Sequence, residues 1–282
     1  MSAQLPDNTH IASAHLLTAD LPRALRFYSD LMGFQIIRQD DSSATLSADG
    51  RTPHLLLSAR PGARPKPRNG TGLYHVAIRF PNRNALGRTF RRMLVARYPF
   101  GGFSDHGVSE ALYLNDPDGN GLEMYTDRPR STWPRAGERL NMTTEPLDLD
   151  NLLAAADDSP WTGIDPQTDI GHMHLHVSDL GAARHFYSDL LGLDVMQDMG
   201  YHGAIFLAAG GYHHHLGLNI WAGTAPQPPN TLGLRSFALR IPDEAARQAA
   251  IGRLRAGGVA VDDQDGVAVI HDRDGNVTEL VG

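Results

Sequence analysis

Residues 20–34, DLPRALRFYSDLMGF, recur at residues 179–193 as DLGAARHFYSDLLGL, with one constant offset that carries Phe27 onto Phe186. Each stretch has an Asp at the N-cap position, apolar residues at helical spacing and a closing Gly, which together predict an amphipathic helix. A match this long indicates an internal repeat, and a repeat governs the architecture of the whole chain.

Short alternating strands surround each repeated helix. One strand precedes it, as ASAHLLTAD or GHMHLHVSD, and three strands follow it. The same pattern recurs around helices predicted at residues 84–96 and 243–256, each followed by a hairpin turn, DPDGN or DRDGN. We therefore expect an α+β fold built from four βαβββ modules, near residues 10–60, 72–128, 169–222 and 230–282.

The modules divide between two halves of the chain. Residues 1–128 hold modules 1 and 2, residues 169–282 hold modules 3 and 4, and we expect each half to be a domain. Residues 129–168 between them are rich in Pro, Asp and Thr, which predicts a linker, with a short helix at residues 148–156.

The composition predicts a globular protein that acts on a small molecule. The chain has 282 residues, 41% of them hydrophobic, and no apolar run approaches the roughly 18 residues of a membrane span. The net charge is −7 and no Lys/Arg-rich stripe occurs, which argues against nucleic acid and membrane partners. The polar N-terminus lacks signal-peptide features, so we expect a cytoplasmic protein. Its oligomeric state, a homo-oligomer included, stays open.

The FYSDLLGL-type helices and the DPDGNGLE turn resemble those of the vicinal oxygen chelate superfamily, which includes glyoxalase I, extradiol dioxygenases and antibiotic-resistance proteins. The stretches SDHGVSEALYLNDPDGNGLEMYTDRP and GYHHHLGLNIW are similar to the bacterial catechol 2,3-dioxygenase group within it. The resemblance covers nearly the whole chain. It implies that the modules pair into two cupped mixed β-sheet barrels, with a metal in a cup.

The resemblance also implies where metal ligands lie, because the first strand of each module can offer one. The motif residue is His75 in module 2 and His172 in module 3, whereas modules 1 and 4 have Ser13 and Ser236. Serine is a poor ligand for a divalent transition metal. Apolar side chains alternate with His75 and His172 along their strands, so both histidines face away from the predicted core.

The last strand of an even module can supply a carboxylate, Glu123 in GLEMY or Glu279 in VTELVG. Pairing of modules 2 and 3 would join His75, His172 and Glu123, a two-histidine, one-carboxylate set suited to Fe(II) and O₂ chemistry, with Mn(II) as the alternative ion. Pairing of modules 3 and 4 would instead join His172 with Glu279. We favour the first pairing, which leaves modules 1 and 4 as a metal-free cup.

Extradiol enzymes of this superfamily use further acid–base residues, a His from an odd module and a His and a Tyr from an even module. The matches in module 2 are His106 and Tyr113; the spacing from Tyr113 to the carboxylate fits, whereas His106 to Tyr113 is a little short. The odd-module match is His214 in YHHHLGLN, and His54 in module 1 is the weaker candidate. Histidine suits acid–base work near neutral pH.

The run of three histidines at residues 213–215 is expected to lie in a strand. Consecutive strand residues point to opposite faces, so all three cannot reach one site. We expect His214 to act at the metal, while His213 and His215 pack or surround the site.

The function that these expectations support is an extradiol ring-cleaving dioxygenase. It would insert both atoms of O₂ into a catechol-type aromatic diol at a non-haem Fe(II) site, in the catabolism of aromatic compounds. A glyoxalase-like metal-dependent isomerase is one alternative, for which Glu279 would serve if modules 3 and 4 pair. A metal-free small-molecule binding or resistance protein is the other, because its cups need only apolar walls.

Overall fold

The computed structural model describes residues 4–282, and its main elements are two eight-stranded mixed sheets. The first sheet has the order β16-β17-β18-β15-β1-β4-β3-β2, so it joins module 4 to module 1. Its strands, in chain order from β1, are His10–Thr18, Gln35–Gln39, Ser43–Ser47, Leu55–Ala59, Gly233–Arg240 (β15), Val261–Gln264, Val267–His271 and Val277–Val281.

The second sheet has the order β12-β13-β14-β11-β5-β8-β7-β6 and joins module 3 to module 2. Its strands, in chain order from β5, are Gly72–Phe80, Gly102–Asp105, Ser109–Asn115, Gly121–Asp127, Asp169–His176 (β11), Asp194–Met199, Ala204–Ala208 and Leu216–Asn219. The predicted pairing of modules 2 with 3 and 1 with 4 is therefore confirmed, and the alternative pairing of 3 with 4 in one sheet is wrong.

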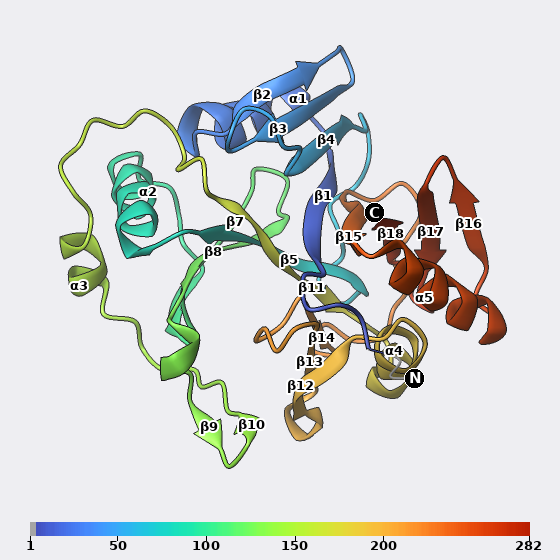
Figure 1. The fold of residues 1–282 in the computed structure, drawn as a ribbon. Helices are drawn as coiled ribbons and strands as arrows, with labels where there is room; N and C mark the ends of the chain where they lie inside the picture. The colour runs from blue at the N-terminus through green and yellow to red at the C-terminus, as the bar shows by residue number, and fades with distance from the viewer. Residues whose placement is uncertain (1–3) are drawn as a thin grey trace.

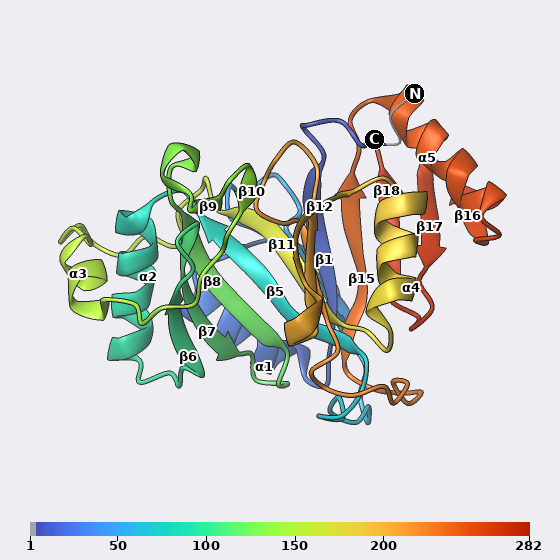
Figure 2. The ribbon, with the colours of Figure 1, turned by 90° about the horizontal axis from the view of Figure 1, so that it is seen from below.

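Helices cover the outer sides of this arrangement. Figure 2 shows α2 and α3 at one side of the molecule and α4 and α5 at the other, with β1, β5, β11 and β15 between them. The helices are α1 Leu21–Leu25, α2 Arg83–Val95, α3 Leu149–Ala154, α4 Leu180–Arg184 and α5 Glu244–Ala256. Across residues 4–282, none of the helices is long and apolar enough to cross a lipid bilayer.

The repeated FYSDL segments continue α1 and α4 as π-helical turns, Arg26–Leu31 and His185–Leu190. Their buried tyrosines make equivalent contacts: Tyr28 donates a hydrogen bond to Asp116 at 2.9 Å, and Tyr187 donates one to Asp272 at 3.0 Å. Each acceptor is the first residue of a DPDGN or DRDGN turn. These contacts connect module 1 to 2 and module 3 to 4, whereas the sheets connect 2 to 3 and 1 to 4.

Strands β5 and β11 form the antiparallel pair at the middle of the second sheet (Figure 1). Val76, Ile78, Met173 and Leu175 lie on the face of this pair that packs into the hydrophobic core, as strand alternation predicts. The register shifts between Ile170 and His172, and a bulge of this kind re-aims side chains and is common next to active sites. The opposite face of the pair therefore carries histidines from both strands.

The histidine run lies before a strand rather than within it, because β14 begins at Leu216. The expectation that residues 213–215 lie in a strand is therefore wrong, although His214 alone of the three lines the cavity described below. The predicted helix near residues 148–156 is confirmed as α3, and a short hairpin of β9 (Arg135–Ala136) and β10 (Arg139–Leu140) precedes it. The division of the chain at residues 129–168 into two domains stays a prediction.

Candidate metal centre

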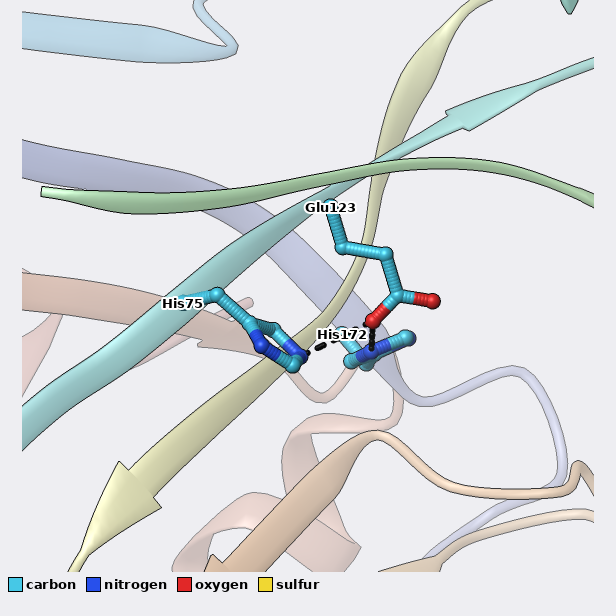
Figure 3. Close-up of side chains that lie close together, drawn as sticks. All are labelled: His75, Glu123 and His172. Carbon is cyan, nitrogen blue, oxygen red and sulfur yellow. Dashed lines mark hydrogen bonds and ion pairs between the residues drawn. The ribbon is translucent and has the colours of Figure 1, made fainter. Parts of the chain in front are cut away.

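The three expected metal ligands meet on adjacent strands of the second sheet: His75 on β5, Glu123 on β8 and His172 on β11. Their ligand atoms all lie within 4.8 Å of one another, and all three side chains are buried. Glu123 Oε2 lies 2.9 Å from His75 Nε2 and 3.2 Å from His172 Nε2 (Figure 3). Two imidazole nitrogens thus converge on one carboxylate oxygen.

The donor set fits a divalent transition metal. The buried His75 Nε2 is close to the carboxylate but has no partner in hydrogen-bond geometry within the described chain, so its lone pair is free to coordinate. Burial alone would raise the pKa of Glu123, but the neighbouring His172 and His75 side chains outweigh it and hold this pKa well below the usual carboxyl range. An ionised carboxylate beside two imidazoles is the two-histidine, one-carboxylate set of non-haem iron sites.

His172 reaches the centre as a neutral imidazole. Burial lowers the pKa of His172 to about 4, although the Glu123 carboxylate acts in the opposite direction. A neutral histidine and an ionised glutamate are the protonation states in which these side chains bind metals. The site therefore needs no further deprotonation of His172 or Glu123 at neutral pH before a cation binds.

A cavity of about 700 Å³ opens on the same face of the second sheet. His75 and Glu123 lie in its wall, whereas His172 is fully buried behind it. The remaining lining includes the expected acid–base residues His106, Tyr113 and His214. Glu123 is the only carboxylate among the described residues of this lining, which bears on which reactions the cavity supports.

Tyr113 and His106 form one hydrogen-bonded unit in the wall. His106 Nδ1 lies 2.7 Å from the carbonyl of Thr143, which can only accept, so Nδ1 carries the proton. His106 Nε2 then accepts from the Tyr113 hydroxyl at 2.7 Å. Burial, followed by the nearby Glu123 charge, raises the pKa of Tyr113 well above its usual value, so the hydroxyl keeps its proton.

His214 lies against the metal centre, with its ring centroid 4.0 Å from that of His172. Its Nδ1 is 2.7 Å from His213 Nδ1, and His213 Nε2 is 2.8 Å from the Asp127 carboxylate. Because the carboxylate can only accept, His213 carries its proton on Nε2 and accepts at Nδ1 from His214. His214 therefore has its proton on Nδ1, and its Nε2 is left unprotonated.

The first sheet has no comparable centre within the described residues. Ser13 and Ser236 lie at the expected positions on β1 and β15. Glu279, on β18, is in the sheet that does not contain His172, so it is excluded as the alternative ligand. The ring of His54 accepts from the Ala48 amide at 3.1 Å, which gives it a structural role.

His54 corresponds to His215 rather than to His214. His215 Nδ1 accepts from the Ala209 amide at 3.2 Å, in the same i, i+6 arrangement as His54 with Ala48. This contact agrees with the expectation that His215 packs next to the site and takes no direct part in it. His213, by contrast, bonds directly to His214.

Two family-model matches cover residues 9–124 and 169–280, both to the glyoxalase/bleomycin resistance protein/dioxygenase superfamily. The chain belongs to this superfamily. A curated superfamily relative, the catechol-2,3-dioxygenase of Bacillus subtilis (strain 168), is 44% identical over 263 residues, which are 92% of each chain.

Two solved structures share the fold of this chain. A Bacillus subtilis protein superposes with a TM-score of 0.67 at 13% identity, covering 99% of this chain and 86% of its own. Glyoxalase I from Zea mays superposes with a TM-score of 0.60 at 18% identity, covering 97% and 92%. The two-sheet fold and the resemblance inferred from the sequence are thus confirmed.

Three residues around the metal centre and its cavity were not predicted from the sequence. Asp127 ends β8 and orients His213, although only its position four residues after Glu123 could have marked it. Thr143 lies in the segment expected to be a linker, yet its carbonyl holds His106. Lys66 lines the cavity from the segment between β4 and β5, which has no periodic pattern.

Proposed function

We propose that the protein is an extradiol dioxygenase that opens a catechol-type aromatic diol with O₂. In this reaction the ring bond beside the diol breaks and both oxygen atoms enter the product, so no external reductant is consumed. The observation that carries the proposal is the buried His75, Glu123 and His172 set at the wall of a cavity that also exposes His214. The relationship to the Bacillus subtilis catechol-2,3-dioxygenase supports the same reaction.

Fe(II) is the cofactor that we propose for this set, held by His75, Glu123 and His172. Two histidines and one carboxylate leave open coordination positions, and this arrangement is typical of non-haem Fe(II) oxygenases. The ion, when bound, supplies a Lewis acid and a template for the diol and O₂. Mn(II) accepts the same ligands and is the alternative that metal analysis would identify.

His214 is the base that we propose for the diol. Its Nδ1 proton is engaged by His213, so the free Nε2 lone pair can accept a proton from a hydroxyl in the cavity. Burial, followed by the neighbouring His172, holds the pKa of His214 well below its usual value, so the ring is a neutral imidazole before the substrate binds. An accepted proton would then be available for return to the product.

Tyr113 and His106 are the proton-donating pair that we propose on another part of the wall. The Tyr113 hydroxyl shares its proton with His106 Nε2, while the Thr143 carbonyl fixes the orientation of the His106 ring. The buried Tyr113 hydroxyl keeps its proton because its pKa is raised, and rotation of the O–H from His106 toward the cavity would let it donate a hydrogen bond to a substrate oxygen as charge develops.

A glyoxalase-like isomerase is the second candidate, since glyoxalase I shares the fold. Such proton-abstraction chemistry would need a second carboxylate at the metal centre to act as the base. Glu123 is the only carboxylate in the described cavity lining, and Glu279 lies in the other sheet. These observations favour ring cleavage over isomerisation.

The test is oxygen uptake with catechol as substrate. Protein purified without O₂ and loaded with Fe(II) should consume one O₂ per catechol and form a yellow ring-opened product. Apo-protein and Zn(II)-loaded protein are the controls, and neither should turn over. Conversion of a thiol adduct of a 2-oxoaldehyde, without uptake of O₂, would support the isomerase instead.

A further inference from the structure

Lys66 is the only lysine in the chain. The sequence has 25 lysines and arginines, and all of the others are arginine. Arginine suits planar, bidentate partners, whereas lysine is a compact point charge on a flexible stem. The single position that differs from this usage lies in the wall of the cavity that holds the metal centre.

The position of Lys66 along the cavity follows from the backbone around Gly72. Gly72 has a φ of +109°, and a Cβ at this residue would lie 3.5 Å from the Lys66 Cε atom, so the lysine stem runs close over it. Gly72 pairs with His176 across strands β5 and β11. Lys66 therefore lies at the His176 end of β11, away from the metal ligand His172.

Lys66 has no partner of opposite charge. It makes no hydrogen bond or ion pair within the described residues, and it is half-buried. Burial lowers the pKa of Lys66 to about 8. A desolvated ammonium without a counter-ion is unfavourable unless a ligand supplies the charge.

The surrounding wall adds positive charge and does not cancel it. Arg68 also lines the cavity, and within the described residues it has no ion-pair partner. Glu123, the one carboxylate that residues 4–282 contribute to this lining, is engaged by His75 and His172. A protein with a net charge of −7 thus has an uncompensated positive end in its cavity.

Aromatic rings connect the two ends of the cavity. His172, His174 and His176 follow one face of β11, and two steps of about 7 Å separate the first from the third. Tyr74 lies 4.8 Å from His176 and 5.8 Å from Trp221 between ring centroids. A flat ring at the metal and a side chain of a few bonds would span this distance.

We propose that Lys66, with Arg68 beside it, binds a carboxylate on the substituent of the aromatic diol, so that catechols with an acidic side chain are the preferred substrates. The proposal rests on the proposed ring cleavage. Ring cleavage converts one of the diol carbons into a carboxylate, and this new carboxylate lies at the metal. Lys66 lies at the opposite end of the cavity, so it would bind a different carboxylate, one that the substrate carries before cleavage.

Binding can be tested without turnover, because protein labelled with ¹³C-lysine gives a single side-chain signal. Iron-loaded protein kept free of O₂ should show a titration of Lys66 near pH 8. Addition of 3-(3,4-dihydroxyphenyl)propanoate should raise this midpoint by about one unit or more, whereas its methyl ester should not. No response to the acid, or an equal response to the ester, would overturn the proposal.

Selectivity gives the second test. Lys66→Met should lower the ratio of kcat/KM for the acid to kcat/KM for catechol roughly tenfold to a hundredfold, as loss of a charge-assisted contact predicts. Lys66→Arg should restore most of the ratio. Arg38→Met, which removes an exposed charge on β2 of the other sheet, is the control and should leave the ratio unchanged.

An unchanged ratio in Lys66→Met, or the same loss in Arg38→Met, would refute the subsite. Absence of any catechol cleavage would refute the proposed function instead, and the lysine signal would still report whether the acid binds.

Discussion

The Nδ1 atoms of His213 and His214 lie 2.7 Å apart, so one of these nitrogens carries a proton and the other accepts it. Asp127 determines which of the two nitrogens carries the proton. Its carboxylate lies 2.8 Å from His213 Nε2 and can only accept, so His213 donates from Nε2 and accepts at Nδ1. The order of protons runs from His214 through His213 to Asp127 and leaves His214 Nε2 as an acceptor. A carboxylate behind a histidine sets the tautomer of catalytic triads in the same way.

Asp127→Asn should reverse this order. Arg79 lies 3.5 Å from Asp127 Oδ2, so the amide oxygen is expected there and the amide NH₂ toward His213. His213 would then accept at Nε2 and donate from Nδ1, which moves the His214 proton to Nε2 and abolishes the acceptor. We expect kcat for catechol cleavage to fall by about a hundredfold or more, with the iron content unchanged.

Tyr212→Phe is the matched control for Asp127→Asn. It removes a hydrogen bond to Asp127 at 3.0 Å without altering the proton order at His213. Its effect on kcat should be small. Equal losses in the two variants, or loss of iron from Asp127→Asn, would show that Asp127 has only a structural role.

The metal ligands could be predicted because they lie inside the repeat. The offset that relates Phe27 to Phe186 places the first strand of each module, and strand alternation assigns the outward face to His75 and His172. Module pairing, however, depends on which strand edges meet, and a periodic pattern does not encode this choice. Only the pairing of β5 with β11 distinguishes between the two candidate carboxylates for His172, Glu123 and Glu279.

The supporting residues could not be predicted for a different physical reason. Lys66 and Thr143 lie in connecting segments, where no period relates a side chain to a face, and each reaches the cavity only through the fold. The strand was expected to include the three histidines, but β14 begins only at Leu216, so strand alternation did not apply to His213. Its bond to Asp127 joins residues that are 86 apart in sequence.

Glu123→Gln should empty the metal centre. The substitution removes the charge that two neutral imidazoles cannot supply, and metal affinity should fall by at least tenfold to a hundredfold. Iron per chain, measured after anaerobic loading and desalting, should be near zero. Glu279→Gln changes the equivalent residue in the first sheet and should retain full iron; equal iron in both variants would contradict this site.

Tyr113→Phe should lower kcat roughly tenfold to a hundredfold and leave the iron content unchanged, since the phenol bonds His106 at 2.7 Å and is not in the ligand set. Tyr28→Phe is its control. The Tyr28 hydroxyl bonds the buried Asp116, so that variant should lose about 1–2 kcal/mol of stability and keep its kcat. A kcat loss in Tyr28→Phe as large as that in Tyr113→Phe would contradict a direct role for Tyr113.

Stability should fall as the pH drops below about 6.5, because buried histidines resist protonation. Burial, followed by the neighbouring His213, lowers the pKa of His215 to about 3, whereas a histidine in the unfolded chain titrates near 6.5. Below pH 6.5, His215 therefore binds a proton in the unfolded state but not in the native state. Between pH 7.5 and 5 this group alone should remove roughly 2 kcal/mol from the free energy of unfolding.

His215→Gln isolates this contribution. Glutamine does not titrate, so the stability deficit of the variant at pH 7.5 should shrink by roughly 2 kcal/mol at pH 5. Urea unfolding of both proteins across this range, followed by circular dichroism, measures the difference. Parallel curves would mean that His215 takes up its proton equally in the native and unfolded states, contrary to its burial against Tyr212.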